Sequence, residues 1–384
     1  MHITKSEALG AVLALFLVLS AHPLVAATAG TLSVTTDSSS PDFQVASSGQ
    51  TDFTAGAFNF SASGEDITLQ NIGLTLSHGF TNDLVKVSLY DGATKVGEAF
   101  FTGSSATSTL STPVFIPAGP DKVITVKIDF SMVGKGEPVT HSGDAVVVNF
   151  LSAQGVGNTS GATINATGST NLSGVGLMKA VPFFVLDSLP PGDDLSAGDL
   201  MRFKVTASPT GSVGITNFGL GTRIRGVQMK HLTIYGFTDA NYSHPIRGVQ
   251  ASGDLQATDD CSDYCPSGTT YYSIGAADAS GAPTIIEIPA GVTRYFEVEA
   301  QVDTPTRDAS ITTFVAGNNT PPGAPMVSVS SAQNPMFTAA QLPAEGLIWS
   351  PNSTKVATRE NQDWTNAYGV LPLTTFFQTL YAQQ

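Results

Sequence analysis

Two cysteines, Cys261 and Cys265, are the residues whose type and spacing point most directly to chemistry. They lie four positions apart in an aspartate-rich stretch, and the chain has no other cysteine. A zinc site would need two further ligands, and the nearby His244 supplies only one candidate. In an exported protein, a lone close pair is typical of a small disulfide that fixes the tip of a loop. We therefore predict a disulfide between these two cysteines.

Aspartates gather in a second stretch, rich in proline and glycine, and comprise Asp187, Asp193, Asp194 and Asp199. Calcium prefers several oxygen ligands that converge from a flexible loop, so these carboxylates are candidate metal ligands. The alternative is a solvated turn in which the aspartates bind backbone amides. No EF-hand pattern is present. Calcium is thus the one cofactor to consider, against the simpler expectation that the protein has none.

Aromatic residues beside amides and carboxylates form a third group. Both tryptophans, Trp349 and Trp364, lie near the C-terminus with Tyr368, and Tyr264 lies between the two cysteines. Rings of this kind can stack on the apolar faces of sugars while amides and carboxylates bind the hydroxyls. The competing interpretation is structural: Trp349 belongs to the last strand of a domain, and Trp364 packs a tail against that domain.

Catalytic motifs are absent from the sequence. There is no HExxH, no GxSxG, no P-loop and no GxGxxG after a strand, and the histidines are scattered. Adjacent carboxylates occur at 65–66, 193–194 and 259–260, which keeps a polysaccharide hydrolase as a distant alternative. Each pair lies in a Gly- or Ser-rich turn, where carboxylates commonly bind backbone amides. We expect a protein that is not an enzyme.

The strands that must position these residues are indicated by a tetrapeptide that occurs twice in the sequence. Ile-Pro-Ala-Gly stands at 116–119 and again at 288–291, and an alternating apolar run begins 8 residues after each isoleucine. The repeat extends backwards, because 67–74 matches 213–220 without a gap. Alternation with period two predicts strands, and a repeat of this length predicts a whole domain copied in tandem.

The second copy is longer than the first. Between Tyr235 and Ile288 lie 27 residues more than between Tyr90 and Ile116, and both cysteines fall in this insertion. We predict a signal peptide at 1–27, one domain at 28–180, a second at 181–335, and a last strand with a tryptophan-containing tail at 336–384. Loops on a rigid scaffold usually carry specificity, so the insertion and the tail are where we expect function.

Composition agrees with this division. Only 12% of residues are charged, and 38 glycines and 22 prolines separate short alternating runs. These features are typical of antiparallel β-sandwiches, so we predict an all-β chain of two tandem Ig-like sandwiches, with little helix beyond the signal peptide. A net charge of −14 without a basic cluster argues against nucleic acid as a partner, because phosphate contacts need lysine and arginine.

The N-terminus has the pattern of a secretory signal peptide. A basic start is followed by an apolar run from Ala8 to Ala21 and by small residues up to Ala27. The alternative is an uncleaved membrane anchor, since Ala8 to Ala27 is about long enough to span a bilayer. No other segment is apolar enough to cross a membrane. We expect a secreted protein that is associated with the cell surface and has no membrane span after cleavage.

The chain resembles the tandem Ig-like surface proteins predicted in ultra-small candidate-phylum bacteria. The resemblance rests on the segments 30–35, 58–62, 64–67, the two Ile-Pro-Ala-Gly strands, 349–353 and 363–366. It implies exported β-sandwich modules on the cell envelope, with a role in adhesion or in a surface layer. Glycans, other surface proteins and further copies of the chain are then the expected partners. A carbohydrate-binding protein that uses the insertion or the tail is the main alternative.

Overall fold

The computed structural model describes residues 28–133, 142–191, 195–256, 261, 263–317, 346–353, 357–373 and 376–382. In these residues the chain forms strands and one short 3-10 turn, η1 (Thr81–Asp83). The all-β prediction is confirmed. The predicted signal peptide lies outside the described residues, and no helix in the described part is long and apolar enough to span a membrane.

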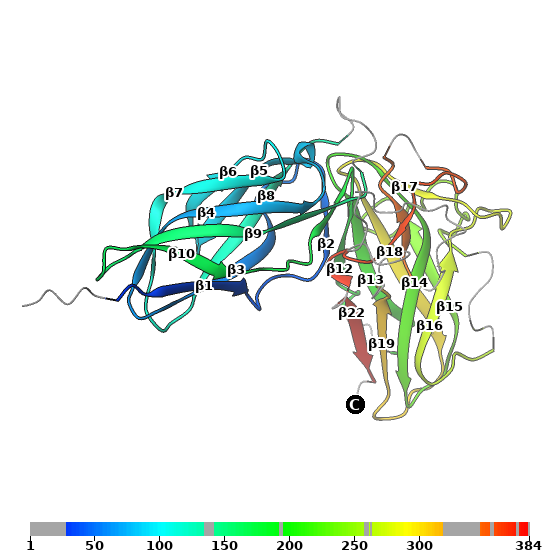
Figure 1. The fold of residues 1–384 in the computed structure, drawn as a ribbon. Helices are drawn as coiled ribbons and strands as arrows, with labels where there is room; N and C mark the ends of the chain where they lie inside the picture. Colours follow the sequence, from blue (N-terminus) through cyan, green and yellow to red (C-terminus); the bar gives the residue numbers. More distant parts are fainter. Residues whose placement is uncertain are drawn as a thin grey trace, which may run out of the picture.

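The first half of the chain folds into two packed layers (Figure 1). One layer has the order β1-β3-β8-β5-β6; in the other, β4 lies between β7 and β9. Most pairs are antiparallel, but β1 pairs with β10 and β2 with β11 in parallel. The strands are β1 (Thr31–Thr36), β2 (Gln44–Ser47), β3 (Phe53–Ser63), β4 (Ile67–His78), β5 (Leu84–Asp91), β6 (Thr94–Ala99), β7 (Ser105–Ile116), β8 (Lys122–Phe130), β9 (Asp144–Gly157), β10 (Thr163–Gly168) and β11 (Val175–Met178).

The second half forms a second sandwich. A four-stranded sheet, β12-β13-β18-β15, packs against a seven-stranded sheet built around β14, and the rings of Phe203, Phe218 and Phe296 meet in the core between them. The strands are β12 (Pro182–Asp187), β13 (Asp199–Ala207), β14 (Val213–Arg225), β15 (Met229–Phe237), β16 (Gly268–Gly275), β17 (Ile286–Ile288), β18 (Thr293–Val302), β19 (Ser310–Val315), β20 (Ile348–Ser350), β21 (Thr365–Asn366) and β22 (Phe377–Tyr381).

Equivalent strands of the two halves pair in the same register. Ile67 of β4 lies opposite Ile116 of β7, and their counterparts Val213 and Ile288 lie opposite each other in β14 and β17. The same holds for the other sheet, where Phe58 faces Ile124 and Phe203 faces Phe296. The repeated sequence therefore builds the same strand pairing twice.

The halves differ where the second copy is longer. The single strand β7 of the first half corresponds to two strands, β16 and β17, which are separated by residues 276–285. In place of β6, the described residues after β15 form only isolated bridges, from Tyr235 to Asp254 and from Phe237 to Pro245. The insertion thus covers one edge of the four-stranded sheet.

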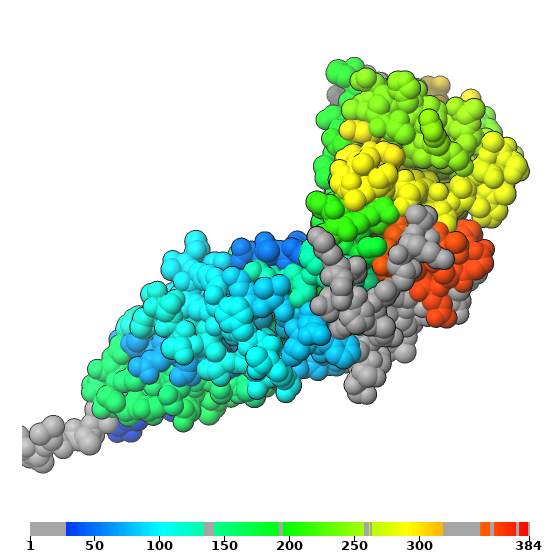
Figure 2. Space-filling view, turned by 90° about the horizontal axis from the view of Figure 1, so that it is seen from above, coloured from blue at the N-terminus to red at the C-terminus, as the bar shows by residue number. Residues whose placement is uncertain are grey.

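The two sandwiches meet at an angle, as Figures 1 and 2 show. The buried core of the first reaches Leu177, and that of the second starts at Met178. Near the C-terminus, the Ser353 hydroxyl donates a hydrogen bond of 2.9 Å to the hydroxyl of Ser142, which lies between β8 and β9 of the first half. The C-terminal segment therefore contacts both sandwiches.

Candidate functional site

The two tryptophans are buried. Both side chains are 0% exposed, and Trp349 lies in β20, where it pairs with Ile215 of β14. Its indole Nε1 donates 2.8 Å to the carbonyl oxygen of Asn366, and the Nε1 of Trp364 donates 2.8 Å to that of Thr358. Stacking of either indole on an external sugar is therefore not available in this structure, and the packing interpretation describes them better.

The polar residues around the tryptophans bind one another. The Asn352 amide Nδ2 donates to Ser212 and to the Glu287 carboxylate, both at 2.8 Å. The Asp363 carboxylate accepts a 2.8 Å hydrogen bond from the Ser350 hydroxyl, and burial raises the pKa of Asp363. Because these amides and carboxylates hydrogen-bond to one another, they fix the C-terminal segment to the second sandwich.

Tyr368, the third predicted ligand contact in this region, also has an internal partner. Its ring stacks on that of Phe43 from the first half, with the ring centroids 5.2 Å apart and the planes 14° from parallel. The neighbouring Gly369 carbonyl accepts a 3.0 Å hydrogen bond from the Val45 amide. This tyrosine therefore joins the C-terminal segment to the first sandwich.

Cys261 and Cys265 form the predicted disulfide. The loop is tied to β15, because the Cys265 amide donates 2.8 Å to the Met229 carbonyl and the Cys261 carbonyl accepts from the His231 amide at 3.1 Å. Tyr264 between the cysteines is 52% exposed, and the Lys230 ammonium lies 5.9 Å from its ring centroid. Of the four predicted ligand contacts, this tyrosine is the most exposed.

The predicted calcium ligands divide into three sets. Asp187 forms an ion pair of 3.1 Å with the Lys204 ammonium and accepts a 3.1 Å hydrogen bond from the Tyr242 hydroxyl. Asp193 and Asp194 lie outside the described residues. Asp199 belongs to another group, which its carboxylate forms with those of Glu297 and Glu299.

This acidic group, Asp199, Glu297 and Glu299, brings ligand oxygens within 4.8 Å of one another. An arginine already compensates part of its charge, since the Arg202 guanidinium lies 2.5 Å from the Glu297 carboxylate. Burial, together with the neighbouring carboxylates, raises the pKa of Glu299 to about 7. Repulsion among the three carboxylates is thus reduced in part by Arg202 and in part by protonation of Glu299.

An exposed surface on the second sandwich was not anticipated from the sequence. We call it the aromatic face and define it by the side chains of Arg223, Arg225, Tyr271, Phe314, Phe377 and Tyr381, which line or adjoin a groove of about 530 Å³. Tyr271, Phe377 and Tyr381 are 60%, 53% and 68% exposed. The six side chains of the aromatic face come from β16, β14, β19 and β22, which lie side by side in the sheet (Figure 1).

Strand register places the rings of the aromatic face in one row. Gly221 of β14 lies between Tyr271 on one side and Phe314 on the other, and Phe314 lies opposite Phe377 of β22. Three inter-strand spacings of about 4.8 Å give a row roughly 14 Å long. A second row lies parallel to the first, two residues further along each strand. It contains Arg223 and three hydroxyl side chains, those of Thr269, Thr312 and Thr379.

Gly221 makes room for this row. A Cβ atom there would lie within 3 Å of three atoms of the Phe314 ring, so the ring lies across the bare backbone of β14. From this position Phe314 meets Tyr271 edge-on, with the centroids 5.7 Å apart. Glycine in a strand is otherwise unfavourable, and an aromatic ring that covers it recovers part of the lost packing.

The base of the groove is apolar, and the charged side chains that line it are positive. Buried Leu373 and Phe376 lie beneath it, and no aspartate or glutamate is among the described residues that line it. Arg223 donates through Nε to the Thr269 hydroxyl at 3.3 Å. Neither Arg223 nor Arg225 forms an ion pair with a carboxylate in the described part of the chain. The groove is therefore apolar below and cationic at one side.

Among the described residues of the first sandwich, the corresponding strands carry no such row of rings. The positions equivalent to Gly221, Tyr271 and Phe314 are occupied by Thr75, Ser105 and Asn149, which are paired in the same way. The aromatic face therefore belongs to the second copy alone.

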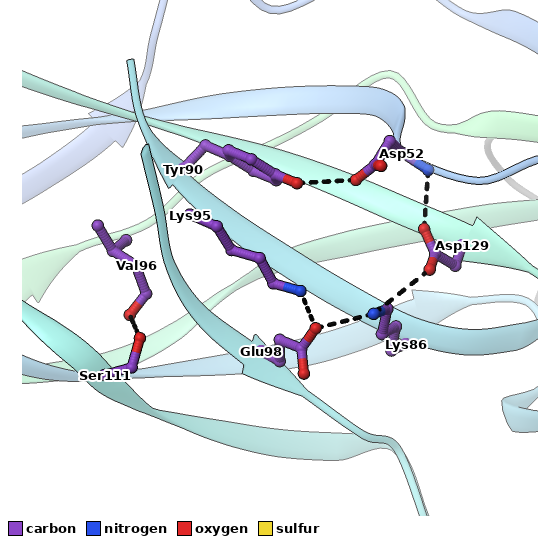
Figure 3. A network of polar contacts seen from close by, with 8 residues as sticks. All are labelled: Asp52, Lys86, Tyr90, Lys95, Val96, Glu98, Ser111 and Asp129. Carbon is purple, nitrogen blue, oxygen red and sulfur yellow. Dashed lines mark hydrogen bonds and ion pairs between the residues drawn. The ribbon is translucent and has the colours of Figure 1, made fainter. Parts of the chain in front are cut away.

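On the other sheet of the first sandwich, β5, β6 and β8 carry a network of polar contacts (Figure 3). The Lys86 ammonium lies 2.8 Å from the Glu98 carboxylate and 3.7 Å from that of Asp129. The Tyr90 hydroxyl donates 2.9 Å to Asp52, whose amide donates 2.7 Å to Asp129. Here Lys86 and Lys95 have carboxylate partners, whereas the two arginines of the groove form no ion pair within the described residues.

One sequence signal marks the aromatic face. The residues Phe377, Thr379 and Tyr381 alternate with Gln378 and Leu380, which is the pattern of a strand with one apolar, exposed side. Arg223 and Arg225 alternate in the same way around a buried isoleucine. These segments are far apart in the chain, so the sequence alone does not show that they share one sheet.

Comparison with known proteins adds little. No protein-family model matches the chain, and a search of curated proteins finds no match. Among solved structures, a structure of manganese lipoxygenase of Gaeumannomyces graminis with part of zonadhesin of Komagataella pastoris is 12% identical, with a TM-score of 0.15, and the match covers 74% of this chain and 87% of that chain. Red sea bream transglutaminase is 12% identical, with a TM-score of 0.17 and coverage of 75% and 29%. A protein described as membrane-anchored from Corynebacterium diphtheriae is 9% identical, with a TM-score of 0.15 and coverage of 74% and 90%. Likenesses this distant carry no argument about function.

Proposed function

We propose that the protein is an exported, non-catalytic surface protein with an adhesive role, and that it holds a polysaccharide chain on the aromatic face of its second sandwich. The observation that carries the proposal is the row of aromatic rings Tyr271, Phe314 and Phe377, in which Tyr271 and Phe377 are exposed and Phe314 is half-buried, beside a row of hydroxyl and guanidinium donors. The β-rich fold and the disulfide between Cys261 and Cys265 are compatible with such a role.

The chemistry of the groove suits a sugar polymer. Aromatic rings offer apolar surface to the C–H faces of sugar rings, and hydroxyl and guanidinium groups bind sugar oxygens. A row of roughly 14 Å across the strands is long enough to contact more than one ring of an extended chain. The open groove supports binding along a polymer in preference to enclosure of a small molecule.

The same groove supports binding without cleavage. Glycoside hydrolysis uses two carboxyl groups on opposite sides of the scissile bond. The described residues that line this groove include none. The polysaccharide hydrolase that we kept as a distant alternative would therefore need another site.

A glycan array probed with the full mature chain tests the proposal. We expect wild-type protein to bind a polysaccharide and Phe377→Ala to weaken that binding roughly 2- to 12-fold, as the loss of one aromatic contact of about 0.5–1.5 kcal/mol implies. Phe100→Ala is the matched control, because Phe100 is 59% exposed on the first sandwich. Equal losses in both variants, or a wild-type protein that binds no polysaccharide, would contradict the proposed function.

Melting curves accompany the array. Phe377 lies at the start of β22, so a variant that loses the strand could lose binding for structural reasons. Tyr381→Ala, at the other end of β22 and 68% exposed, gives a second perturbation of the same surface. We expect both variants to keep the wild-type melting temperature within about 2 °C, since exposed substitutions usually change stability by less than about 0.5 kcal/mol.

A further inference from the structure

The aromatic face carries positive charge with no acidic residue among the described side chains that line its groove. The chain has 31 acidic and only 17 basic residues, so carboxylates are plentiful as partners. On the opposite sheet of the second sandwich, Arg202 pairs with Glu297 at 2.5 Å, and Lys204 with Asp187 at 3.1 Å. Arg223 and Arg225 have no such partner in the described part of the chain, although both border the groove.

We infer that the polysaccharide is a polymer of uronic acids, whose carboxylates bind Arg223 and Arg225 while its sugar rings lie on the aromatic face. This inference rests on the proposed function and names its ligand class. A guanidinium group matches a carboxylate with two parallel hydrogen bonds, and its charge makes those bonds stronger than those to a neutral hydroxyl.

The placement of the two arginines fits a repeating ligand. They are two residues apart in β14 with buried Ile224 between them, so both side chains leave the same face of the sheet. The rise of a strand sets their backbone separation at about 6.7 Å. Arg223 lies opposite Thr312, and Arg225 lies opposite Ser310, so each guanidinium has a hydroxyl neighbour on β19 that can bind the same sugar.

The rings of Phe314 and Tyr271 lie close enough to Arg223 for one sugar unit to contact all three. Gly221, over which the Phe314 ring lies, is two residues from Arg223 in the same strand. A sugar ring on Phe314 and Tyr271 therefore has Arg223 beside it, within the reach of a carboxylate attached to that ring. A neutral polysaccharide would use the rings but leave both guanidinium groups without an anionic partner.

The direct test uses polygalacturonate and its fully methyl-esterified form, because esterification removes the carboxylate charge and keeps the chain. We expect wild-type protein to bind polygalacturonate about tenfold more tightly than the ester, with affinity that falls as salt is added. The double variant Arg223→Gln, Arg225→Gln should bind both polymers equally and weakly. The matched control is Arg247→Gln, an exposed arginine of the second sandwich outside the groove, which should keep the preference.

The possible outcomes distinguish a failure of the uronic-acid inference from a failure of polysaccharide binding itself. If the ester binds as tightly as polygalacturonate, and Phe377→Ala weakens both, the uronic-acid inference is wrong while polysaccharide binding stands. If wild-type protein binds neither polymer nor any other glycan, the proposed function itself fails. A preference for dextran sulfate, which carries sulfate esters and no carboxylate, over polygalacturonate would overturn the carboxylate assignment in favour of sulfate esters. An unchanged preference in the double arginine variant would also refute the inference.

Discussion

Gly221→Ala is the substitution that tests most sharply how the aromatic face is built. The added methyl group would lie within 3 Å of three atoms of the Phe314 ring, so the ring must turn away from β14. Overpacking of this kind costs about 1 kcal/mol at the low end of its range, because a ring at the surface can move. Loss of the edge contact with Tyr271 adds about 0.5–1.5 kcal/mol.

A strand alanine is intrinsically better than glycine by about 0.5–1 kcal/mol, which offsets part of this cost. The net expectation is a loss of about 1 kcal/mol in the free energy of unfolding, seen as a melting temperature roughly 2–4 °C lower. Urea denaturation and thermal melting measure it. The displaced ring should also weaken polysaccharide binding, because it no longer lies in one row with Tyr271 and Phe377.

Gly103→Ala is the matched control. A Cβ at Gly103 would have no atom within 4 Å, so this variant should be as stable as wild type or more stable by about 0.4–1 kcal/mol. If Gly221→Ala is equally well tolerated and binds polysaccharide normally, then Phe314 does not lie across β14, and the reasoning about this face is refuted.

Further expectations concern the rest of the second sandwich. Glu299 has a pKa raised to about 7 from 4.5, so its contribution to stability is fully present below pH 4.5 and is lost as pH rises through 7. Glu299→Gln should therefore be more stable than wild type at pH 8, by at most about 3 kcal/mol, and melting curves that run parallel at all pH values would refute the burial argument. Replacing Cys261 and Cys265 with serine should lower stability by about 2 kcal/mol in denaturation experiments and leave polysaccharide binding unchanged, since the disulfide lies outside the groove. Trp364→Ala should cost about 3–5 kcal/mol in urea unfolding, and lost glycan binding at unchanged stability would instead restore its role in sugar stacking.

Sequence periodicity predicted the framework well because strands with one buried side repeat every two residues. The alternating runs after each Ile-Pro-Ala-Gly phrase became β8 and β18, and their buried residues Ile124 and Phe296 occupy equivalent core positions. The disulfide was predictable for a similarly local reason, because only two cysteines exist and four positions separate them.

The aromatic residues were harder to interpret because burial is a property of the whole fold. Trp349, Trp364 and Tyr368 are residue types that commonly stack on sugars. In the structure, however, Trp349 lies in β20 and is buried in the core, and Phe43 stacks on Tyr368. Whether an aromatic side chain faces solvent depends on strands that are distant in sequence, and no local pattern reports it.

The aromatic face was missed for the same reason. Its rings come from β16, β19 and β22, and residues 276–309 and 316–376 separate these strands in the chain. The C-terminal strand β22 breaks the internal repeat, so alignment of the two copies could not place it beside β19. A local clue existed at Gly221, which replaces Thr75 of the first copy in the middle of a strand.

Hydroxyl-radical footprinting with polygalacturonate tests the central claim most directly, because exposed aromatic side chains are oxidised unless a ligand covers them. We expect the polymer to protect Tyr271, Phe377 and Tyr381, while Tyr264 in the disulfide loop and Phe100 on the first sandwich stay as reactive as in free protein. Protection of Tyr264 or Phe100 in place of these three rings, or protection nowhere at saturating polymer, would contradict the account.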